Sequence, residues 1–411
     1  MSFTRQSANL TPIVDAVFAI VELAKKDCEI NGPELVTNAT IGSLYDEQGQ
    51  LVALNSVFEH YDAIPKQIKA AYAEGMAGNN SYRQQVYRWV VQGRQLNLAH
   101  SVIATPGGSG AVASTFCNIL DEGQTVVLPD IAWGSYRLMA SHNNINTVTY
   151  SMFDEDRFNL ESFKSTCLAT LKKQNKLLVV INDPCHNPTG YSMTNAEWEE
   201  VIAFINECSK QAPCVILNDI AYIDYGLNPN HTRDYLLNYN HLSDNVLVVV
   251  AFSCSKALTS YGLRCGAAVI LGKDDHKVRE AEIVYEKTAR SLWSNIANAA
   301  MDNFTWVTTE NLDNYMQEKE TYIDLMRQRS TLFIEQANAH QLPYYPFREG
   351  FFVTLKIIDP ELLSHFHQAL IEHHIYTVKV HCGIRIALCS LSIKKIDGLA
   401  KRMKEILDQC Q

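Results

Sequence analysis

Four short, largely apolar runs, each followed by a polar turn, constrain the fold of this chain more than any other feature. They lie at residues 125–128, 176–181, 214–217 and 245–252. None is long enough to span a membrane, and the last is rich in valine, which favours buried strands. Helical patterns separate them, as at residues 195–210. Continuous apolar strands that alternate with helices are typical of a mainly parallel sheet covered on both faces, so the sequence predicts an α/β fold.

The two ends of the chain have a different pattern from this central part. Residues 11–32 predict an amphipathic helix with an N-cap, a proline at its first position and a glycine stop. After Gly272 the pattern changes to long, charged helical stretches. Residues 351–355 and 384–388 are expected to be strands of a smaller domain, which a helix starting at Ser392 closes.

Charge and cysteine usage limit the possible partners. The 411-residue chain has a net charge of −10, which argues against nucleic acid, because binding a phosphate backbone needs a basic face. Its 11 cysteines are scattered without a Cys-x-x-Cys pair, and residues 1–5 lack the features of a signal peptide. We therefore expect reduced thiols and a cytoplasmic protein. No apolar segment reaches membrane-spanning length, so no membrane partner is expected.

A glycine-rich turn at residues 105–110 follows a further expected strand and opens a helix. Free backbone N–H groups and the helix dipole at such a place suit a phosphate, although a plain tight turn would have the same composition. Gly108, Gly110 and Ala113 also match a relaxed dinucleotide-binding fingerprint, and Asp130 lies at a strand end about 20 residues further on. An NAD-dependent dehydrogenase is therefore an alternative, but it leaves the other strand ends unexplained.

Three other strand ends carry chemically active side chains, and ligands collect at the carboxyl ends of strands in open α/β sheets. Residues 182–190 contain two X-Pro pairs, and in this rigid loop we expect a cis peptide bond at Asn187–Pro188. The next strand ends at Asp219, and the last leads to Lys256. Each alone has an ordinary explanation, as a structural turn, a helix N-cap or a solvated lysine. Burial of the lysine would lower its pKa toward neutrality and allow a Schiff base with an aldehyde.

Together these strand ends supply a phosphate cradle, an amide donor, a carboxylate and an amine. That set fits pyridoxal 5′-phosphate, whose phosphate, 3′-oxygen, ring nitrogen and aldehyde need those four partners in turn. A carboxylate such as Asp219 keeps the pyridine nitrogen protonated, so that the ring can act as an electron sink. The sequence therefore predicts a pyridoxal-phosphate enzyme.

Three motifs stand in order along the chain: Asn187-Pro188-Thr189-Gly190, Asp219-x-Ala221-Tyr222, and Ser253-x-Ser255-Lys256 followed by Arg264. In order and spacing they resemble the motifs of the fold-type I pyridoxal-phosphate aminotransferases of class I/II, closest to the aspartate and aromatic amino acid subgroup. The resemblance covers about residues 35–390. It implies a large cofactor-binding domain (51–300) with a mainly parallel seven-stranded sheet, and a smaller α/β domain made of residues 1–50 and 301–411.

The resemblance also implies a role for each cofactor-binding residue. Lys256 would form the Schiff base and then move a proton between Cα and C4′, while Asp219 would pair with the pyridinium. Tyr222 and Asn187 would bind the phenolate oxygen. The phosphate would be held by Gly108, Ser109, Ser253 and Arg264.

Further residues are expected around this group. Trp133 falls where the family stacks an aromatic side chain on the cofactor ring, although an ordinary core tryptophan is the alternative. His186 would hydrogen-bond the Asp219 carboxylate. Tyr82 would reach the phosphate of the neighbouring subunit, which implies a homodimer with shared sites. Gly107 departs from the family, because a phosphate-binding serine is frequent at its position.

Four residues are expected to bind the substrate. Arg385, inside an otherwise apolar strand, resembles the arginine that holds the substrate α-carboxylate; a buried structural salt bridge is the alternative. Arg290 resembles the subgroup's arginine that meets a dicarboxylate side chain across the dimer. Gly42 lies in a segment like the subgroup's N-terminal one, and Phe352 falls where that subgroup places an aromatic facing the substrate.

The expected activity is transfer of an amino group from an aromatic amino acid, aspartate or glutamate to a 2-oxo acid, with 2-oxoglutarate as the expected acceptor, by way of pyridoxamine phosphate. A β-lyase or another pyridoxal-phosphate enzyme of the same fold is an alternative, because the pocket only selects which bond breaks. No metal site is expected, because the sequence lacks a ligand framework around the histidines that cluster near the C-terminus, His365, His367, His373 and His374.

Overall fold

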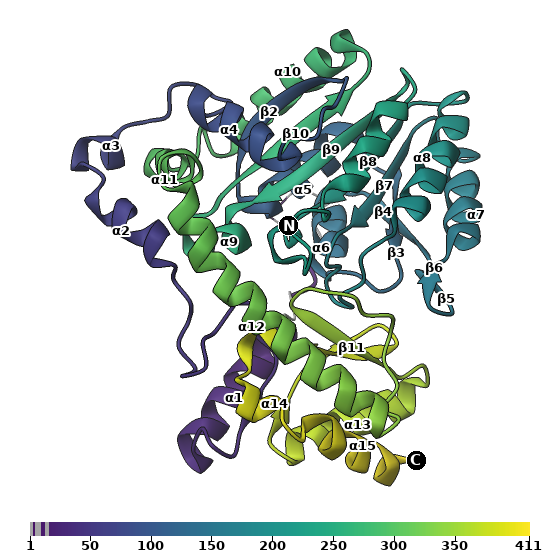
Figure 1. The fold of residues 1–411 in the computed structure, drawn as a ribbon. Helices are drawn as coiled ribbons and strands as arrows, with labels where there is room; N and C mark the ends of the chain where they lie inside the picture. The colour runs from purple at the N-terminus through teal and green to yellow at the C-terminus, as the bar shows by residue number, and fades with distance from the viewer. Residues whose placement is uncertain (1–2, 5–9, 13–15) are drawn as a thin grey trace.

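The computed structural model describes residues 3–4, 10–12 and 16–411 (Figure 1). Its centre is a seven-stranded sheet in the order β2-β10-β9-β8-β7-β3-β4. Neighbouring strands from β9 to β4 are parallel, and β10 runs antiparallel to both β9 and β2. The predicted mainly parallel seven-stranded sheet is therefore confirmed. Its strands are β2 (Ala99–Pro106), β3 (Thr125–Pro129), β4 (Asn146–Tyr150), β7 (Leu177–Asn182), β8 (Cys214–Asp219), β9 (Val246–Ser253) and β10 (Cys265–Gly272).

Helices cover both faces of this sheet, as the continuous apolar strands predict. Successive side chains of a strand point to opposite faces. Val179 of β7 accordingly packs in a core cluster with Trp198, whereas its neighbour Val180 packs in a second cluster with Phe116. One face carries α7 (Leu160–Leu171) and α8 (Asn195–Ser209), and the other carries α5 (Gly107–Ile119), α6 (Ser135–His142) and α10 (Asp275–Leu292).

The C-terminal part of the chain forms a smaller three-stranded sheet, and a separate two-stranded sheet beside it includes an N-terminal strand. Three antiparallel strands follow the order β11-β14-β13, and β1 pairs with β12 in parallel. The strands are β1 (Thr37–Asn38), β11 (Phe352–Lys356), β12 (Ile375–Tyr376), β13 (Val378–Val380) and β14 (Gly383–Ala387). The helices beside them are α1 (Ala16–Asn31), α13 (Pro360–Glu372), α14 (Ile393–Ile396) and α15 (Leu399–Cys410). The predicted N-terminal helix is present from Ala16, and residues 13–15 lie outside the described part of the chain.

The 28-residue helix α12 (Leu312–Ala339) runs from the large sheet to the smaller one (Figure 1). The proposed boundaries at residues 50 and 300 remain a prediction. The remaining elements are α2 (Asn55–Ala63), α3 (Lys66–Ala70), α4 (Asn80–Val91), α9 (Cys254–Ala257), α11 (Asn298–Thr309), β5 (Phe153–Asp154), β6 (Arg157–Phe158), and the short helices η1 (Ile223–Tyr225), η2 (Asp234–His241), η3 (Tyr261–Leu263) and η4 (Leu388–Ser390).

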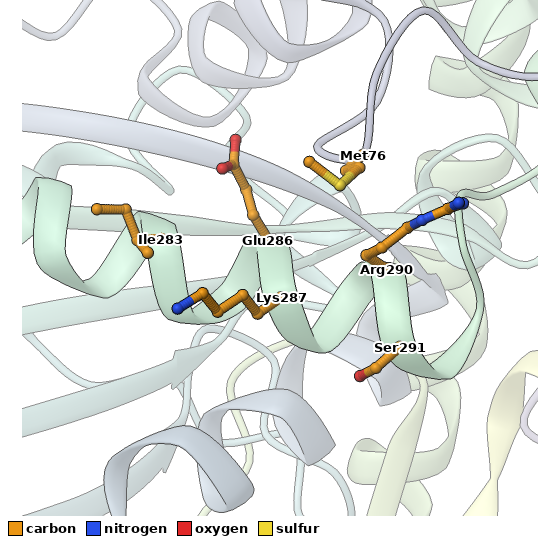
Figure 2. Close-up of a pocket in the computed structure, with 6 residues that line it drawn as sticks. All are labelled: Met76, Ile283, Glu286, Lys287, Arg290 and Ser291. Atoms are coloured by element: carbon orange, nitrogen blue, oxygen red, sulfur yellow. The ribbon is translucent and has the colours of Figure 1, made fainter.

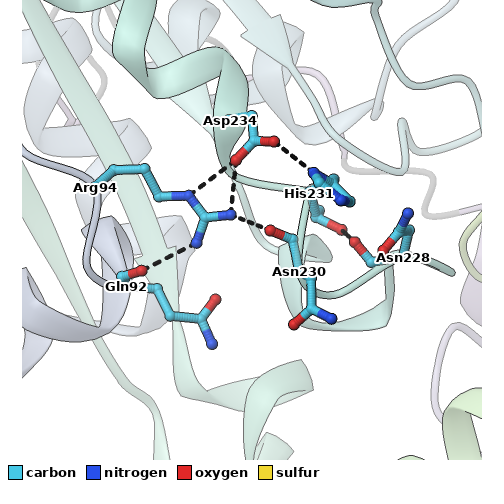
Figure 3. Close-up of polar contacts among 7 residues, drawn as sticks. Gln92, Arg94, Asn228, Asn230, His231 and Asp234 are labelled. Carbon is cyan, nitrogen blue, oxygen red and sulfur yellow. Dashed lines mark hydrogen bonds and ion pairs between the residues drawn. The ribbon is translucent and has the colours of Figure 1, made fainter.

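Polar contacts hold the long connection between β8 and β9 against the end of α4. Arg94 bridges to Asp234 at 2.7 Å and donates to the Gln92 carbonyl at 3.0 Å (Figure 3). His231 contacts the other carboxylate oxygen of Asp234 at 2.7 Å. This cluster fixes the start of η2, whose buried tyrosines pack behind β8. Within the described residues, no helix combines the length and the apolar character needed to cross a bilayer.

Candidate active site

A pocket of about 820 Å³ opens at the carboxyl ends of the parallel strands and is closed on one side by the smaller sheet. That volume lies within the usual range for small-molecule sites. Twelve of the residues predicted from sequence line it: Gly42, Gly108, Ser109, Trp133, Asn187, Asp219, Tyr222, Ser253, Lys256, Arg264, Phe352 and Arg385. Two others, Tyr82 and Arg290, do not line it.

Lys256 follows strand β9 on the short helix α9, and its side chain is exposed only in part. Its amine donates to the Gly42 carbonyl and lies 4.7 Å from the centre of the Tyr261 ring. No carboxylate of the described residues lies within ion-pair distance of it. Burial lowers the pKa of Lys256 from 10.5 to about 8, and the charges of Arg385 and Arg264 act in the same direction. A lysine of this kind is suited to nucleophilic and proton-transfer chemistry.

Asp219 ends strand β8 and is buried. Its Oδ2 accepts a hydrogen bond from the Tyr136 hydroxyl at 2.6 Å, and its Oδ1 accepts one from the Ala221 N–H at 3.1 Å. Burial raises the pKa of Asp219, and both hydrogen bonds oppose that shift. The expected contact with His186 was wrong, because His186 Nδ1 bonds the Thr189 hydroxyl at 2.8 Å and its Nε2 is buried without a partner.

Asn187 and Tyr222 are neighbours in the pocket. The Asn187 amide lies 3.4 Å from the Tyr222 hydroxyl, and its backbone N–H donates to Asn182 Oδ1 at 2.7 Å. The peptide bond between Asn187 and Pro188 is cis, as predicted, and a second cis bond precedes Pro184. Burial raises the pKa of Tyr222, so its hydroxyl stays protonated and can donate.

The turn between β2 and α5 lies against Arg264. Gly107 has φ +69°, and a Cβ at this position would come within 2.5 Å of Arg264 Nη2. A side chain at position 107 would therefore require the Arg264 guanidinium to shift. Arg264 Nη1 donates to Ser255 Oγ at 3.1 Å, and Ser253 Oγ accepts from the Ser255 N–H at 3.2 Å. Hydroxyl groups, a guanidinium and the N-terminus of α5 therefore converge on one corner of the pocket.

Arg385 lies on β14 and is buried. It donates to the Thr40 carbonyl at 2.7 Å, lies 3.4 Å from Asn187 Oδ1, and stacks over the Phe352 ring at 4.6 Å. No carboxylate of the described chain is within ion-pair distance, and Nε has no hydrogen-bond partner. The alternative of a structural salt bridge is therefore wrong. An unpaired buried guanidinium at a pocket wall is suited to a carboxylate ligand.

Gly42 lets the N-terminal segment approach this wall closely. A Cβ on Gly42 would lie 3.1 Å from Phe352 Cζ. The next residues are held from the other side, because the Leu44 N–H donates to the Tyr261 hydroxyl at 2.9 Å. Tyr261 lines the pocket but was not among the predicted site residues. It stands five positions after Lys256, and nothing in the sequence there distinguishes it from a core tyrosine.

The structure also changes the interpretation of Tyr82. Its side chain is fully buried in its own chain, where the hydroxyl donates to the Gly266 carbonyl at 2.9 Å and the ring packs edge-to-face on Phe304 at 5.4 Å. It lies on the buried face of α4 with Val86 and Trp89, as helical spacing requires. Tyr82 therefore cannot reach a neighbouring subunit, and that assignment was wrong.

Arg290 lies on the last turn of α10, outside the pocket that holds Lys256. It borders a separate surface depression of about 310 Å³, opposite Met76 (Figure 2). Its Nη1 donates to Ser294 Oγ at 2.5 Å. Within one chain Arg290 does not meet Arg385, and its action across a dimer remains a prediction.

The described residues contain no group of three or more histidine, cysteine or acidic side chains that could hold a metal ion. Three of the four clustered C-terminal histidines contact different partners. His367 contacts the Thr377 carbonyl, His373 contacts the Ala369 carbonyl, and His374 contacts Asp27.

The amine of Lys256 and the buried carboxylate of Asp219 lie at the strand ends of the large sheet, and the unpaired guanidinium of Arg385 faces the same pocket from β14 of the smaller sheet. Together they define a pyridoxal-phosphate type of site. Residues 42–403 match the family model of aminotransferase class I and II. The chain therefore belongs to that family, and the predicted resemblance is confirmed over the dehydrogenase alternative.

Known proteins resemble the chain in structure and in sequence. The crystal structure of an aminotransferase from Anaerococcus prevotii has a TM-score of 0.95 and 31% identity, and the match covers 98% of this chain and 99% of that one. Two curated relatives are the mitochondrial aspartate aminotransferase of Schizosaccharomyces pombe, 24% identical over 70% of this chain, and the aromatic-amino-acid aminotransferase of Escherichia coli, 28% identical over 63%. The matches span 66% and 64% of those relatives, just under two thirds of their lengths.

Proposed function

We propose that this protein is an aminotransferase that uses pyridoxal 5′-phosphate to move an amino group from an amino acid to a 2-oxo acid. One observation carries the proposal: Lys256 and Arg385, two cations without a carboxylate partner among the described residues, line the same pocket as Asp219. An aldehyde, a substrate carboxylate and a pyridinium nitrogen require an amine, a guanidinium and a carboxylate in turn.

The residues at one corner of the pocket fit a phosphate. The backbone N–H groups of Gly108 and Ser109 lie in the first turn of the 13-residue helix α5, where anions are stabilised. Ser253 and Arg264 line the same corner. The rest of the cofactor would be held by Asn187 and Tyr222 at the phenolate oxygen, Asp219 at the ring nitrogen, Trp133 on the ring face and Lys256 at the aldehyde.

In this arrangement each side chain has one task. When bound, the cofactor supplies an electron sink for cleavage of a bond at the substrate Cα. Arg385 binds the α-carboxylate through two parallel N–H donors and so orients the Cα–H bond. The amine of Lys256, whose pKa is lowered to about 8 in the cofactor-free protein, would take the proton from the substrate Cα and deliver it to C4′. Asp219 remains an acceptor at the ring nitrogen.

We infer that the substrates are aromatic amino acids, aspartate and glutamate, with 2-oxoglutarate as the acceptor. Two of the curated relatives are named for aspartate and for aromatic amino acids. Apolar walls for an aromatic side chain come from Phe352 beside Arg385, from Val378 directly opposite Arg385 in the strand register, and from Phe18 at the rim. Arg290 of a second subunit would receive the carboxylate of a dicarboxylic substrate.

A homodimer in the cytoplasm completes the proposal. Apolar side chains near Arg290 support an interface, since Met76 is 47% and Leu292 70% exposed, and exposed apolar surface of this kind favours association. All 11 cysteines are unpaired thiols, which fits a reducing compartment.

The visible spectrum of the purified protein tests the function. We expect a yellow protein whose long-wavelength band falls when phenylalanine or aspartate is added and returns when 2-oxoglutarate follows. The Lys256→Ala variant is the control, and in it the band should not respond in this way. A colourless protein that stays colourless after incubation with pyridoxal phosphate would contradict the proposal.

A further inference from the structure

The carboxylate of Asp219 is bound by a residue that lies outside the family motifs. The Tyr136 hydroxyl donates to Asp219 Oδ2 at 2.6 Å, and both side chains are buried. The Ala221 N–H occupies the other oxygen at 3.1 Å. With one donor on each oxygen, rotation of the carboxylate is fixed, and the remaining lone pairs of Asp219 are left for the pocket that it lines.

Tyr136 also contacts a second residue of the pocket. Its ring meets the Trp133 indole edge-to-face, with ring centres 5.3 Å apart and an angle of 83°. The two residues belong to one turn at the start of α6, because the Tyr136 N–H donates to the Trp133 carbonyl at 3.1 Å. Tyr136 therefore touches the side chain proposed for the ring nitrogen and the side chain proposed for the ring face.

The hydrogen bond has a clear electrostatic consequence. Burial raises the pKa of Asp219, and the Tyr136 hydroxyl is the first of the contacts that oppose the shift. Burial and the nearby Asp219 charge raise the pKa of Tyr136, so the tyrosine keeps its proton and remains the donor. A short hydrogen bond to a charged acceptor in a low-dielectric site is among the stronger ones in proteins.

We propose that Tyr136 is a positioning residue for the cofactor: its hydroxyl fixes Asp219 against the ring nitrogen, and its ring holds Trp133 against the ring face. The proposal rests on the proposed function, because it needs a heterocycle with a basic nitrogen in the pocket. It places in Tyr136 the supporting contact that the sequence assigned to His186.

The Tyr136→Phe variant tests this, because it removes the hydroxyl and keeps the ring that packs on Trp133. The matched control is Tyr239→Phe, which removes a buried hydroxyl that donates at 2.9 Å to Asn218, the neighbour of Asp219 in sequence. Both variants are loaded with pyridoxal phosphate labelled with ¹⁵N in the ring, and the ¹⁵N chemical shift and the cofactor dissociation constant are measured.

In Tyr136→Phe we expect the ¹⁵N signal to move toward the unprotonated value and the cofactor to bind roughly tenfold more weakly, as the loss of one charge-assisted hydrogen bond implies. Tyr239→Phe should match the wild type in both. A wild-type shift and affinity in Tyr136→Phe, or equal changes in both variants, would overturn the proposal.

If Tyr136→Phe does not fold, Tyr136→His, which keeps an N–H donor, is compared with Tyr136→Leu. Equal ¹⁵N shifts in those two variants overturn the proposal as well. Failure of the wild type to bind the cofactor would instead refute the proposed function.

Discussion

At the scale of single residues, two cations decide what the pocket can bind. Lys256 and Arg385 have no carboxylate partner in the described chain and are held by the backbone carbonyls of Gly42 and Thr40. Carbonyl groups satisfy donors without neutralising charge, so both cations keep an uncompensated charge in a poorly solvated place. Such an arrangement costs stability and is retained where an anionic or electrophilic ligand takes over the contact.

The loss of folding stability caused by the charge of Lys256 depends on pH. The lowered pKa means that the folded protein loses the lysine proton near pH 8, while the unfolded chain keeps it to about pH 10.5. Below pH 8 both states are protonated and the folded state carries the full penalty; the penalty disappears as pH rises between these values. We expect Lys256→Met to raise the unfolding free energy of the cofactor-free protein by roughly 2–3 kcal/mol at pH 7. This value takes about 1.4 kcal/mol for each unit by which the pKa is lowered and reduces the sum for screening by pocket water.

Urea unfolding of both proteins at several pH values measures this difference, which should shrink steadily from pH 8 upward. Other groups titrate in both proteins alike and cancel in the comparison. A difference that stays constant from pH 7 to pH 10 would contradict the assigned cost.

Replacing Arg385 should remove recognition of the α-carboxylate. We expect Arg385→Gln to lower kcat/KM for every amino acid roughly 100-fold, because two charge-assisted hydrogen bonds are lost. Arg402→Gln is a suitable control, since Arg402 on α15 hydrogen-bonds the Thr37 hydroxyl at 3.5 Å and does not line the pocket. Steady-state kinetics with phenylalanine and with aspartate measure the effect, and a loss confined to one substrate would argue that Arg385 binds a side chain instead.

At the scale of elements, the turn between β2 and α5 brings Gly107, a departure from the family, close to Arg264. Gly107 has a positive φ, and a Cβ there would collide with the Arg264 guanidinium unless that side chain moved. The side chain of Arg264 thus lies over the N-terminus of α5, where it adds its charge to the helix dipole. Compared with a family member that has serine at this position, the chain lacks one hydroxyl, and the Arg264 guanidinium lies close to the glycine.

Gly107→Ala should therefore displace Arg264 and weaken cofactor binding roughly 10- to 100-fold, the range for one lost contact to a charged group. Gly123→Ala is the matched control, because Gly123 also has a positive φ, +84°, but nothing lies within 4 Å of the position of its Cβ. Both variants carry similar backbone strain, so only the collision differs. Cofactor titration followed by absorbance measures the effect, and equal losses in the two variants would remove Arg264 from the explanation.

At the scale of the whole molecule, distant parts of the sequence meet around the pocket. Arg329 of α12 is fully buried and binds Glu47 at 2.7 Å and the Cys389 carbonyl at 3.0 Å, which joins the segment that carries Gly42 to the end of β14. Arg290 does not line this pocket and borders a separate surface depression together with Met76 (Figure 2). One chain thus holds every proposed cofactor contact, and only the proposed dicarboxylate contact of Arg290 would depend on a second chain.

Mixed dimers test that dependence. We expect Arg290→Ala alone to lose roughly 10- to 100-fold in aspartate turnover and little in phenylalanine turnover, as one lost ion pair implies. When it is mixed and refolded with Lys256→Ala, aspartate turnover should recover to about a quarter of the wild-type value. Half of the random dimers are mixed, and one of the two sites in each mixed dimer is intact. Lys256→Ala mixed with Arg385→Gln should show no recovery, since both groups belong to one chain. Absence of recovery in the first mixture would exclude an exchange of Arg290 between subunits.

Much of the fold and site could be predicted because each signal was local. Asp219 ends the apolar strand β8, and Lys256 follows the valine-rich strand β9 on the next short helix. The carboxyl ends of parallel strands meet at one edge, so the motifs converge without further information. The failures were non-local. Tyr82 stands in a plausible motif but lies on the buried face of α4, and Tyr136 reaches Asp219 across 83 positions with no motif to mark it.

The sequence by itself determined the family, the sheet and the set of groups that can hold the cofactor, because alternating buried strands and helices allow few topologies and place strand-end residues together. Only the tertiary structure decided which partner supports Asp219, that Arg385 has no acid beside it, and that Gly107 leaves its space to Arg264. These depend on close packing between segments far apart in sequence, where an ångström decides whether a contact forms, and no local pattern of residues records that distance.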